Sequence, residues 1–184
     1  MLYILNGPPK SGKDTAATFI DVHKNAAHLK FAGPLKEGLK TLLMEDCEAW
    51  YRITETGLKN QKFAPIFQNF TPRECLIDLS ESFMKGHFGE DIFGRLMIKQ
   101  IKRLKKGCNV VISDCGFDLE VLPVVEWIGP ENCHILKLYR EGCDFSGDSR
   151  QYLSEQLFDD IKFSHIENNS TVNNFKAEVL KVID

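Results

Sequence analysis

Short apolar runs alternate with segments of helical periodicity along most of the chain. Uniformly apolar or β-branched runs predict buried strands at residues 2–5, 28–31, 109–113 and 134–138. Apolar positions at helical spacing predict helices at residues 13–23, 34–44, 91–106, 119–127 and 172–182. Strands that alternate with helices indicate an α/β domain whose parallel sheet is covered on both faces.

Residues 45–70 are the main exception, because they lack clear periodicity while carrying many aromatic side chains. The aromatic residues are Trp50, Tyr51, Phe63, Phe67 and Phe70. A segment of this kind either closes over a ligand, where aromatic rings stack on a base, or packs as an irregular excursion. The residues alone leave both interpretations open.

A helix start follows at Thr71. Thr71 suits the N-cap position, Pro72 suits the first turn, and Glu74 completes a capping box. Apolar positions then recur at helical spacing as far as Phe83. Arg73 lies in the first turn, where a positive charge opposes the helix dipole. This unfavourable placement favours a functional reason for the arginine.

The stretch GPPKSGKDT, residues 7–15, nearly matches the phosphate-loop pattern G-x-x-x-x-G-K-[ST]. It follows a predicted strand and opens a predicted helix, which is the context that the pattern requires. Glycines at both ends allow the backbone to curl around an anion, and the helix adds the positive end of its dipole. The loop residues expected to hold a nucleotide are Gly7, Lys10, Ser11, Gly12, Lys13, Asp14 and Thr15.

The loop departs from the pattern at Asp14, which stands where a Ser or Thr hydroxyl normally touches Mg²⁺. A carboxylate is a hard oxygen donor, so it can bind Mg²⁺ directly or through a water. Lys13 is expected to reach the β- and γ-phosphates, and Thr15 to offer its hydroxyl to the α-phosphate. We therefore expect a working phosphate loop in which Asp14 is a metal ligand.

The composition of the chain limits the kinds of molecule that it is expected to bind. The chain of 184 residues carries a net charge of −3, with a pI near 6.0, so no stable nucleic-acid partner is expected. No apolar stretch reaches the roughly 20 residues needed to span a membrane, and no signal peptide is expected. The six cysteines show no zinc-site spacing and predict reduced residues of a cytoplasmic protein.

Four motifs together resemble the phage deoxynucleoside monophosphate kinases. They are GPPKSGKDT, FAGPLK at residues 31–36, TPRE at residues 71–74 and VVISD at residues 110–114. The G-K-D form of the loop is also similar to that of animal phosphomevalonate kinases, which belong to the same broad class. The resemblance implies ATP and Mg²⁺ as cofactors and, for a phage-encoded protein, the host cytoplasm as its location.

The resemblance also implies a fold and a division of the chain into functional regions. It predicts a nucleoside-monophosphate-kinase-like, three-layer P-loop fold with a five-stranded parallel sheet, a substrate flap and a short lid. Residues 1–184 would form one kinase domain, with its core at about 1–44 and 107–184, a helical substrate-binding region at about 45–106 and the lid at about 140–150.

Asp114 is the next candidate, because it follows the predicted strand at residues 109–113. Ligands of open α/β sheets lie beyond the carboxyl ends of strands, so Asp114 is expected to orient Mg²⁺ waters or to contact the acceptor. A turn-initiating aspartate is the alternative, since Gly116 follows closely. The related kinases carry Asp-x-Arg, whereas glycine stands at position 116. The phosphate-binding role that this arginine has in the related kinases is therefore either absent here or performed by another residue.

Phosphoryl transfer requires cations near the transferred group. Arg140 follows the predicted strand at residues 134–138, and Arg150 closes the glycine- and serine-rich loop EGCDFSGDSR. Both are expected to stabilise the transferring phosphoryl group from a lid. The alternative is a surface loop whose arginines pair with its own acidic residues, Glu141, Asp144 and Asp148.

Three further cations are expected to bind the acceptor. Arg73 lies in a region that contacts the acceptor monophosphate in the phage kinases, and Lys36 lies early in the helix at residues 34–44. Arg95 belongs to the face of the helix at residues 91–106 that also carries lysines, so a solvated surface is its alternative.

The leading hypothesis is transfer of a phosphoryl group from ATP to a (deoxy)nucleoside monophosphate, which gives the diphosphate. A second hypothesis keeps the fold and changes the acceptor to phosphomevalonate or a modified pyrimidine nucleotide. A third is a nucleotide-binding module without transfer. A small-molecule nucleotide is the expected partner, and the oligomeric state stays open, with a homodimer as one alternative.

Overall fold

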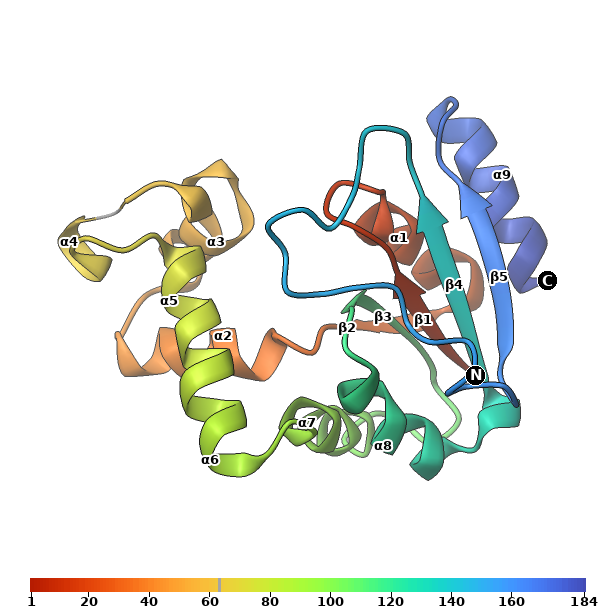
Figure 1. Ribbon diagram of the computed structural model, residues 1–184, viewed down its shortest axis with the longest axis horizontal. Helices are drawn as coiled ribbons and strands as arrows, with labels where there is room; N and C mark the ends of the chain where they lie inside the picture. The colour runs from red at the N-terminus through yellow and green to blue at the C-terminus, as the bar shows by residue number, and fades with distance from the viewer. Residues whose placement is uncertain (63) are drawn as a thin grey trace. The chain divides into compact units, whose positions relative to one another are not determined.

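The computed structural model describes residues 1–62 and 64–184, without the side chains of residues 64 and 65. Phe63 lies outside the described residues. One sheet contains β1 (Leu2–Asn6), β2 (Ala26–Leu29), β3 (Asn109–Cys115), β4 (Cys133–Tyr139) and β5 (Lys162–Glu167). The strand order is β2-β3-β1-β4-β5, and every neighbouring pair is parallel (Figure 1). The expected five-stranded parallel sheet is confirmed.

The helices fall between these strands and, in greatest number, between β2 and β3. The α-helices are α1 (Lys13–Lys24), α2 (Gly33–Leu42), α3 (Cys47–Glu55), α4 (Ala64–Phe67), α5 (Pro72–Asp78), α6 (Gly86–Phe88), α7 (Ile92–Ile101), α8 (Asp118–Ile128) and α9 (Val172–Ile183). The described residues also form two 3₁₀-helices, η1 (Gly57–Asn60) and η3 (Pro130–Asn132), and a π-helix, η2 (Leu79–Lys85). Within the described residues, no helix has the length and apolar character needed to cross a bilayer.

The chain divides into two compact units, which are described separately. The sheet unit consists of Met1–Phe31 and Phe93–Asp184, and the helical unit consists of Ala32–Ile92. All five strands, with α1, α8 and α9, belong to the sheet unit, and α2 to α6 belong to the helical unit. The functional division expected from the sequence, with a substrate-binding region at 45–106 and a lid at 140–150, stays a prediction.

The strand order places helices on both faces of the sheet. The connection from β1 to β2 crosses β3, whereas the connection from β3 to β4 crosses β1 in the opposite direction. Right-handed crossovers that run in opposite directions leave their helices on opposite faces, so α1 and α8 cover different faces. The direction changes at the carboxyl ends of β1 and β3, which is where sheets of this kind bind ligands.

A buried core fills the space between the sheet, α1 and α9. Tyr3 and Leu5 of β1 pack there with Ile20 of α1 and Phe175 of α9. Side chains alternate along a strand, so Leu2 and its alternate neighbours face the opposite side, where they are also buried. Burial on both faces explains why the strands read as continuous apolar runs in the sequence.

Pairing between β1 and β3 changes register close to their carboxyl ends. Leu2 pairs with Val110 and Ile4 with Ile112, but Asn6 pairs with Cys115, which leaves one extra residue on β3. Irregularities of this kind re-aim side chains and are common beside functional sites.

Several elements differ from the expectation, three of them with a clear local reason. β2 covers Ala26–Leu29 rather than residues 28–31, because the left-handed Asn25 ends α1 and turns the chain directly into the strand. α7 ends at Ile101 rather than 106, where the hydrogen bonds tighten to the i−3 pattern. β5 was not located from its residues, since this edge strand carries only two apolar side chains, Phe163 and Ile166, which show neither a period of two nor a continuous apolar run.

The helical unit has a small core of its own. Trp50, Ile53 and Phe67 are buried together, and the described part of residues 45–70 forms α3, η1 and α4. The alternative in which this segment closes over a ligand stays a prediction. The capping box at the start of α5 is confirmed, because the Thr71 hydroxyl accepts from the Glu74 N–H and the Glu74 carboxylate accepts from the Thr71 N–H.

Candidate functional site: the phosphate loop

The loop between β1 and α1 requires glycine at both of its ends. Gly12 has a φ of 105°, in the left-handed region, and a Cβ there would lie 2.5 Å from Asn168 Nδ2. A Cβ on Gly7 would lie 2.6 Å from the carbonyl oxygen of Leu138. The backbone therefore curls tightly between strand and helix, as a phosphate loop must.

Lys13 lies under this curl. Its side-chain amine donates hydrogen bonds to the carbonyl oxygens of Gly7, at 2.7 Å, and Pro8, at 2.6 Å. Burial lowers the pKa of Lys13 to about 8, and the positive charge of Arg150 acts in the same direction, while the Asp14 carboxylate opposes the shift. An anion in the loop would relieve this cost by offering Lys13 a negative partner in place of two neutral carbonyls.

The donors of the loop fit a phosphate. Among the residues that the structure describes, Ser11 Oγ is the buried side-chain polar atom that lacks a hydrogen-bond partner. The first N–H groups of α1 have no acceptor within the helix. Lys10 and Thr15 are exposed beside them. An amine, an unsatisfied hydroxyl and helix N–H groups form a donor set of the kind that binds nucleotide phosphates.

Asp14 is oriented by groups from β2 and β3. The Ser113 hydroxyl donates to Asp14 Oδ1 at 2.7 Å, and His28 Nε2 lies 2.7 Å from the same hydroxyl. Since the hydroxyl hydrogen is directed to Asp14, the neutral His28 donates its Nε2–H to Ser113 Oγ. Lys30 Nζ also lies 3.0 Å from Asp14 Oδ1. The carboxylate is therefore fixed at the mouth of the loop.

The charges around Asp14 favour its ionised form. Partial desolvation opposes ionisation, but the hydrogen bond from Ser113 and the charge of Lys30 lower the pKa of Asp14 below its ordinary value. Burial, and then the charge of Lys30, lower the pKa of His28. The residues fit a Mg²⁺ ion held by one or two carboxylates, with phosphate and water oxygens as its other ligands. Within the described residues, no cluster of three or more His, Cys, Asp or Glu side chains offers a fuller protein cage.

Asp114 supports the backbone beside this carboxylate. Its Oδ1 accepts a hydrogen bond from the Phe31 N–H at 2.8 Å, and the residue is half-buried. It therefore braces the turn that follows β2. The expected role of Asp114 toward Mg²⁺ or an acceptor stays a prediction.

The two arginines of the predicted lid differ in environment. Arg140 is exposed, and its Nη1 donates to the carbonyl oxygen of Lys10 at 3.3 Å. Arg150 forms an ion pair with Asp148 at 2.6 Å, and its side chain is 24% exposed. The pairing with acidic loop residues that the sequence left open is thus present for Arg150. Arg150 nevertheless lies close enough to Lys13 and Asp114 for their charges to influence one another.

The cations expected to bind an acceptor do not all belong to one unit. Lys36 forms an ion pair with Glu55 inside the helical unit, and Arg73 lies in the first turn of α5. Arg95 lies on the exposed side of α7, in the sheet unit. Their common role toward an acceptor stays a prediction.

The helical unit contains a groove of about 640 Å³. Apolar side chains of α2, α4 and α5 form most of its lining, and Glu74, Asp78 and Glu81 supply acidic groups. Carboxylates repel phosphate, so the groove suits an apolar or aromatic group better than it suits a phosphate.

Sequence reasoning missed several residues that support the loop. They are Asn6, His28, Lys30, Ser113 and Asn168. Asn6 and Ser113 carry a detectable signal, because each is a polar residue near the end of a buried apolar strand. Asn168 donates to the carbonyl oxygen of Ser11 at 2.8 Å, a contact that no local pattern indicates.

No protein-family model matches the chain, and no curated protein matches its sequence. TT1252 from Thermus thermophilus is 14% identical, with a TM-score of 0.49 over 100% of this chain and 95% of that one. The dephospho-CoA kinase from Campylobacter jejuni is 14% identical, with a TM-score of 0.52 over 99% of this chain and 94% of that one. Membership of the phage deoxynucleoside monophosphate kinases stays a prediction. The chain has the α/β fold of P-loop kinases, and the likeness extends over almost its whole length.

Proposed function

We propose that this protein is an ATP- and Mg²⁺-dependent kinase that phosphorylates a (deoxy)nucleoside monophosphate to the diphosphate. The observation that carries the proposal is the buried Lys13 in a loop that tolerates no side chain at Gly7 or Gly12. A structural βα turn has no need of a buried amine directed at its own carbonyls. A phosphate-binding loop does, because the same amine turns to the nucleotide.

The residues around the loop support a division of labour. ATP with Mg²⁺ supplies the phosphoryl group and neutralises part of its charge. Lys13 exchanges its two carbonyl partners for phosphate oxygens, and Asp14, oriented by Ser113, holds the metal. Arg150 lies close enough to Lys13 for their charges to interact, and a fixed cation there stabilises charge that develops on the transferred group.

The acceptor half of the proposal rests on other residues. Arg73, Lys36 and Arg95 are the candidates for its phosphate, and the apolar groove of the helical unit is suited to a base. The nucleoside monophosphate is favoured by the sequence resemblance to the phage kinases.

Dephospho-CoA should be tested as a second acceptor, because the structural similarity to the dephospho-CoA kinase covers 99% of the chain. Dephospho-CoA ends in an adenosine nucleotide, so it shares a base and a phosphate with nucleoside monophosphates. Phosphomevalonate and modified pyrimidine nucleotides, which the loop sequence suggests, complete the set.

The test is release of ADP from ATP and Mg²⁺ with each acceptor in turn, confirmed by chromatography of the product. We expect turnover with one or more nucleoside monophosphates, and a loss of kcat of about 10²- to 10³-fold in Lys13→Ala. A melting curve of the variant controls for unfolding. Turnover with dephospho-CoA or phosphomevalonate alone would show that the acceptor is that compound and not a nucleoside monophosphate. ADP binding without turnover on any acceptor would identify a nucleotide-binding module.

A further inference from the structure

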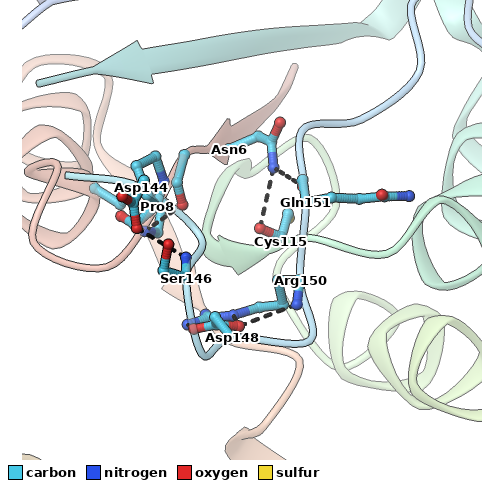
Figure 2. A network of polar contacts seen from close by, with 10 residues as sticks. Asn6, Pro8, Cys115, Asp144, Ser146, Asp148, Arg150 and Gln151 are labelled. Atoms are coloured by element: carbon cyan, nitrogen blue, oxygen red, sulfur yellow. Dashed lines mark hydrogen bonds and ion pairs between the residues drawn. The ribbon is translucent and has the colours of Figure 1, made fainter.

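Residues 148–153, here called the strap, cross the carboxyl ends of β1 and β3 and are fixed there by Asn6. The Asn6 amide donates to the carbonyl oxygens of Cys115, at 3.2 Å, and Gln151, at 3.0 Å, as Figure 2 shows. Asn6 Oδ1 accepts from the Leu153 N–H at 2.8 Å. Asn6 has no exposed surface, so these bonds are shielded from water and the strap is firmly attached.

The strap also binds the chain at Gly116. The Gln151 N–H donates to the Gly116 carbonyl oxygen at 3.0 Å. A Cβ on Gly116 would lie 2.3 Å from the Cβ, 2.5 Å from the Cγ and 2.8 Å from the Cδ of Arg150. The φ of Gly116 is outside the left-handed region, so its backbone conformation does not require glycine. The stem of Arg150 occupies the space that any side chain at position 116 would need.

Asp148 fixes the other end of the same side chain. Arg150 Nε donates to Asp148 Oδ1 at 2.8 Å and Nη2 donates to Oδ2 at 2.6 Å (Figure 2). The Arg150 N–H donates to Oδ1 as well, at 3.0 Å. The Asp148 carboxylate is only 5% exposed. Two parallel bonds of this kind fix the plane of a guanidinium, and they leave its Nη1 donors for an anion.

These contacts indicate an arginine that is in place before any nucleotide arrives. The guanidinium lies near Lys13 and Asp114, the stem rests on Gly116, and the backbone is anchored by Asn6. A cation that is already oriented costs no reorganisation when charge develops in a transition state. Arg150 therefore does not depend on closure of the loop at residues 140–150.

We propose that Gly116 and Asp148 are positioning residues that hold Arg150 preset at the phosphate loop. The inference rests on the proposed function for its kinetic consequence only. The same geometry explains the glycine at position 116. The stem of Arg150 fills the space beside that position, so the residue there must lack a side chain.

The kinetic test is a double-mutant cycle. Gly116→Ala should displace Arg150 and lower kcat by about 10²-fold, with a change below about twofold in ADP affinity, because a misplacement near 1 Å is enough to cause such a loss. In an Arg150→Gly background the same alanine should cost nothing further, since the stem that it strikes is gone. An equal loss in both backgrounds would contradict the proposal, because the alanine would then act through the backbone.

A measurement without substrate separates this proposal from the proposed function. The ¹⁵Nε–¹H signal of Arg150, assigned by its loss in Arg150→Lys, should show a rigid side chain in the ligand-free protein. Asp148→Asn and Gly116→Ala should both make it as mobile as the signal of the exposed Arg103. A mobile Arg150 in the unaltered protein would overturn the proposal. A rigid Arg150 in a protein that phosphorylates no acceptor would overturn only the proposed function.

Discussion

The affinity for a nucleotide should begin to decline at a pH about two and a half units lower than it would with an ordinary lysine. The reason is the environment of Lys13, whose pKa burial lowers from 10.5 to about 8, with the charge of Arg150 as the next cause. Phosphate binds the charged amine, so the bound state favours the protonated form. Above pH 8 the free protein has lost that proton, and binding must take it up again.

The magnitude follows from the pKa. With a free pKa of about 8 and a protonated bound state, the dissociation constant should rise about tenfold between pH 7 and pH 9, or about 1.4 kcal/mol. At pH 9 each binding event should take up about 0.9 proton. A lysine with the ordinary pKa of 10.5 would change the affinity by only a few per cent over the same range.

Calorimetric titration of ADP from pH 7 to 9 in EDTA, repeated in two buffers of different ionisation enthalpy, gives both the affinity and the proton uptake. EDTA removes divalent ions, so Asp14 contributes no metal-linked change. Lys13→Arg is the matched control, because a guanidinium stays charged throughout and should give a flat profile. A flat profile in the unaltered protein, or a tenfold decline that persists in Lys13→Arg, would refute the assignment to Lys13.

Three other perturbations have defined outcomes. Asp14→Ala should raise the Mg²⁺ concentration for half-maximal turnover at least about tenfold with little change in melting temperature; equal activity at limiting Mg²⁺ would exclude Asp14 as a ligand. Gly12→Ala should lower the free energy of unfolding by about 1–3 kcal/mol in urea titrations, because its φ is 105° and its Cβ would strike Asn168. Burial, aided by Lys162, lowers the pKa of His134 to about 4, so the unfolded chain binds more protons below pH 6.5. Stability should therefore fall by up to about 3 kcal/mol between pH 6.5 and 4, and His134→Gln should lose that part of the pH dependence.

Much of the sheet unit was predictable because its signals are local. The apolar runs of β1, β3 and β4 stand out since parallel strands are buried on both faces, and the α5 capping box involves residues only three apart. The phosphate loop was recognisable for the same reason, because Gly7, Lys13 and Asp14 lie close together in the sequence, between the end of β1 and the first turn of α1. Elements without such signals, notably the mostly polar edge strand β5, were not located from their residues.

The site around the loop depended on contacts that the sequence does not encode locally. Ser113 reaches Asp14 from 99 residues away, and Asn6 holds Gln151 across 145 residues. These contacts exist because the order β2-β3-β1-β4-β5 brings the carboxyl ends of distant strands to one edge of the sheet.

The glycine at position 116 shows the division most clearly. In the sequence, glycine stands where the related kinases carry an arginine, and the neighbouring residues along the chain offer no other cation in its place. In three dimensions the stem of Arg150 lies where a side chain at Gly116 would begin. The sequence by itself determined that this chain has a phosphate loop and a parallel sheet, since both follow from local spacing and alternation. Only the tertiary structure decided which cation stands beside that loop, because side chains pack by proximity in space and not by order along the chain.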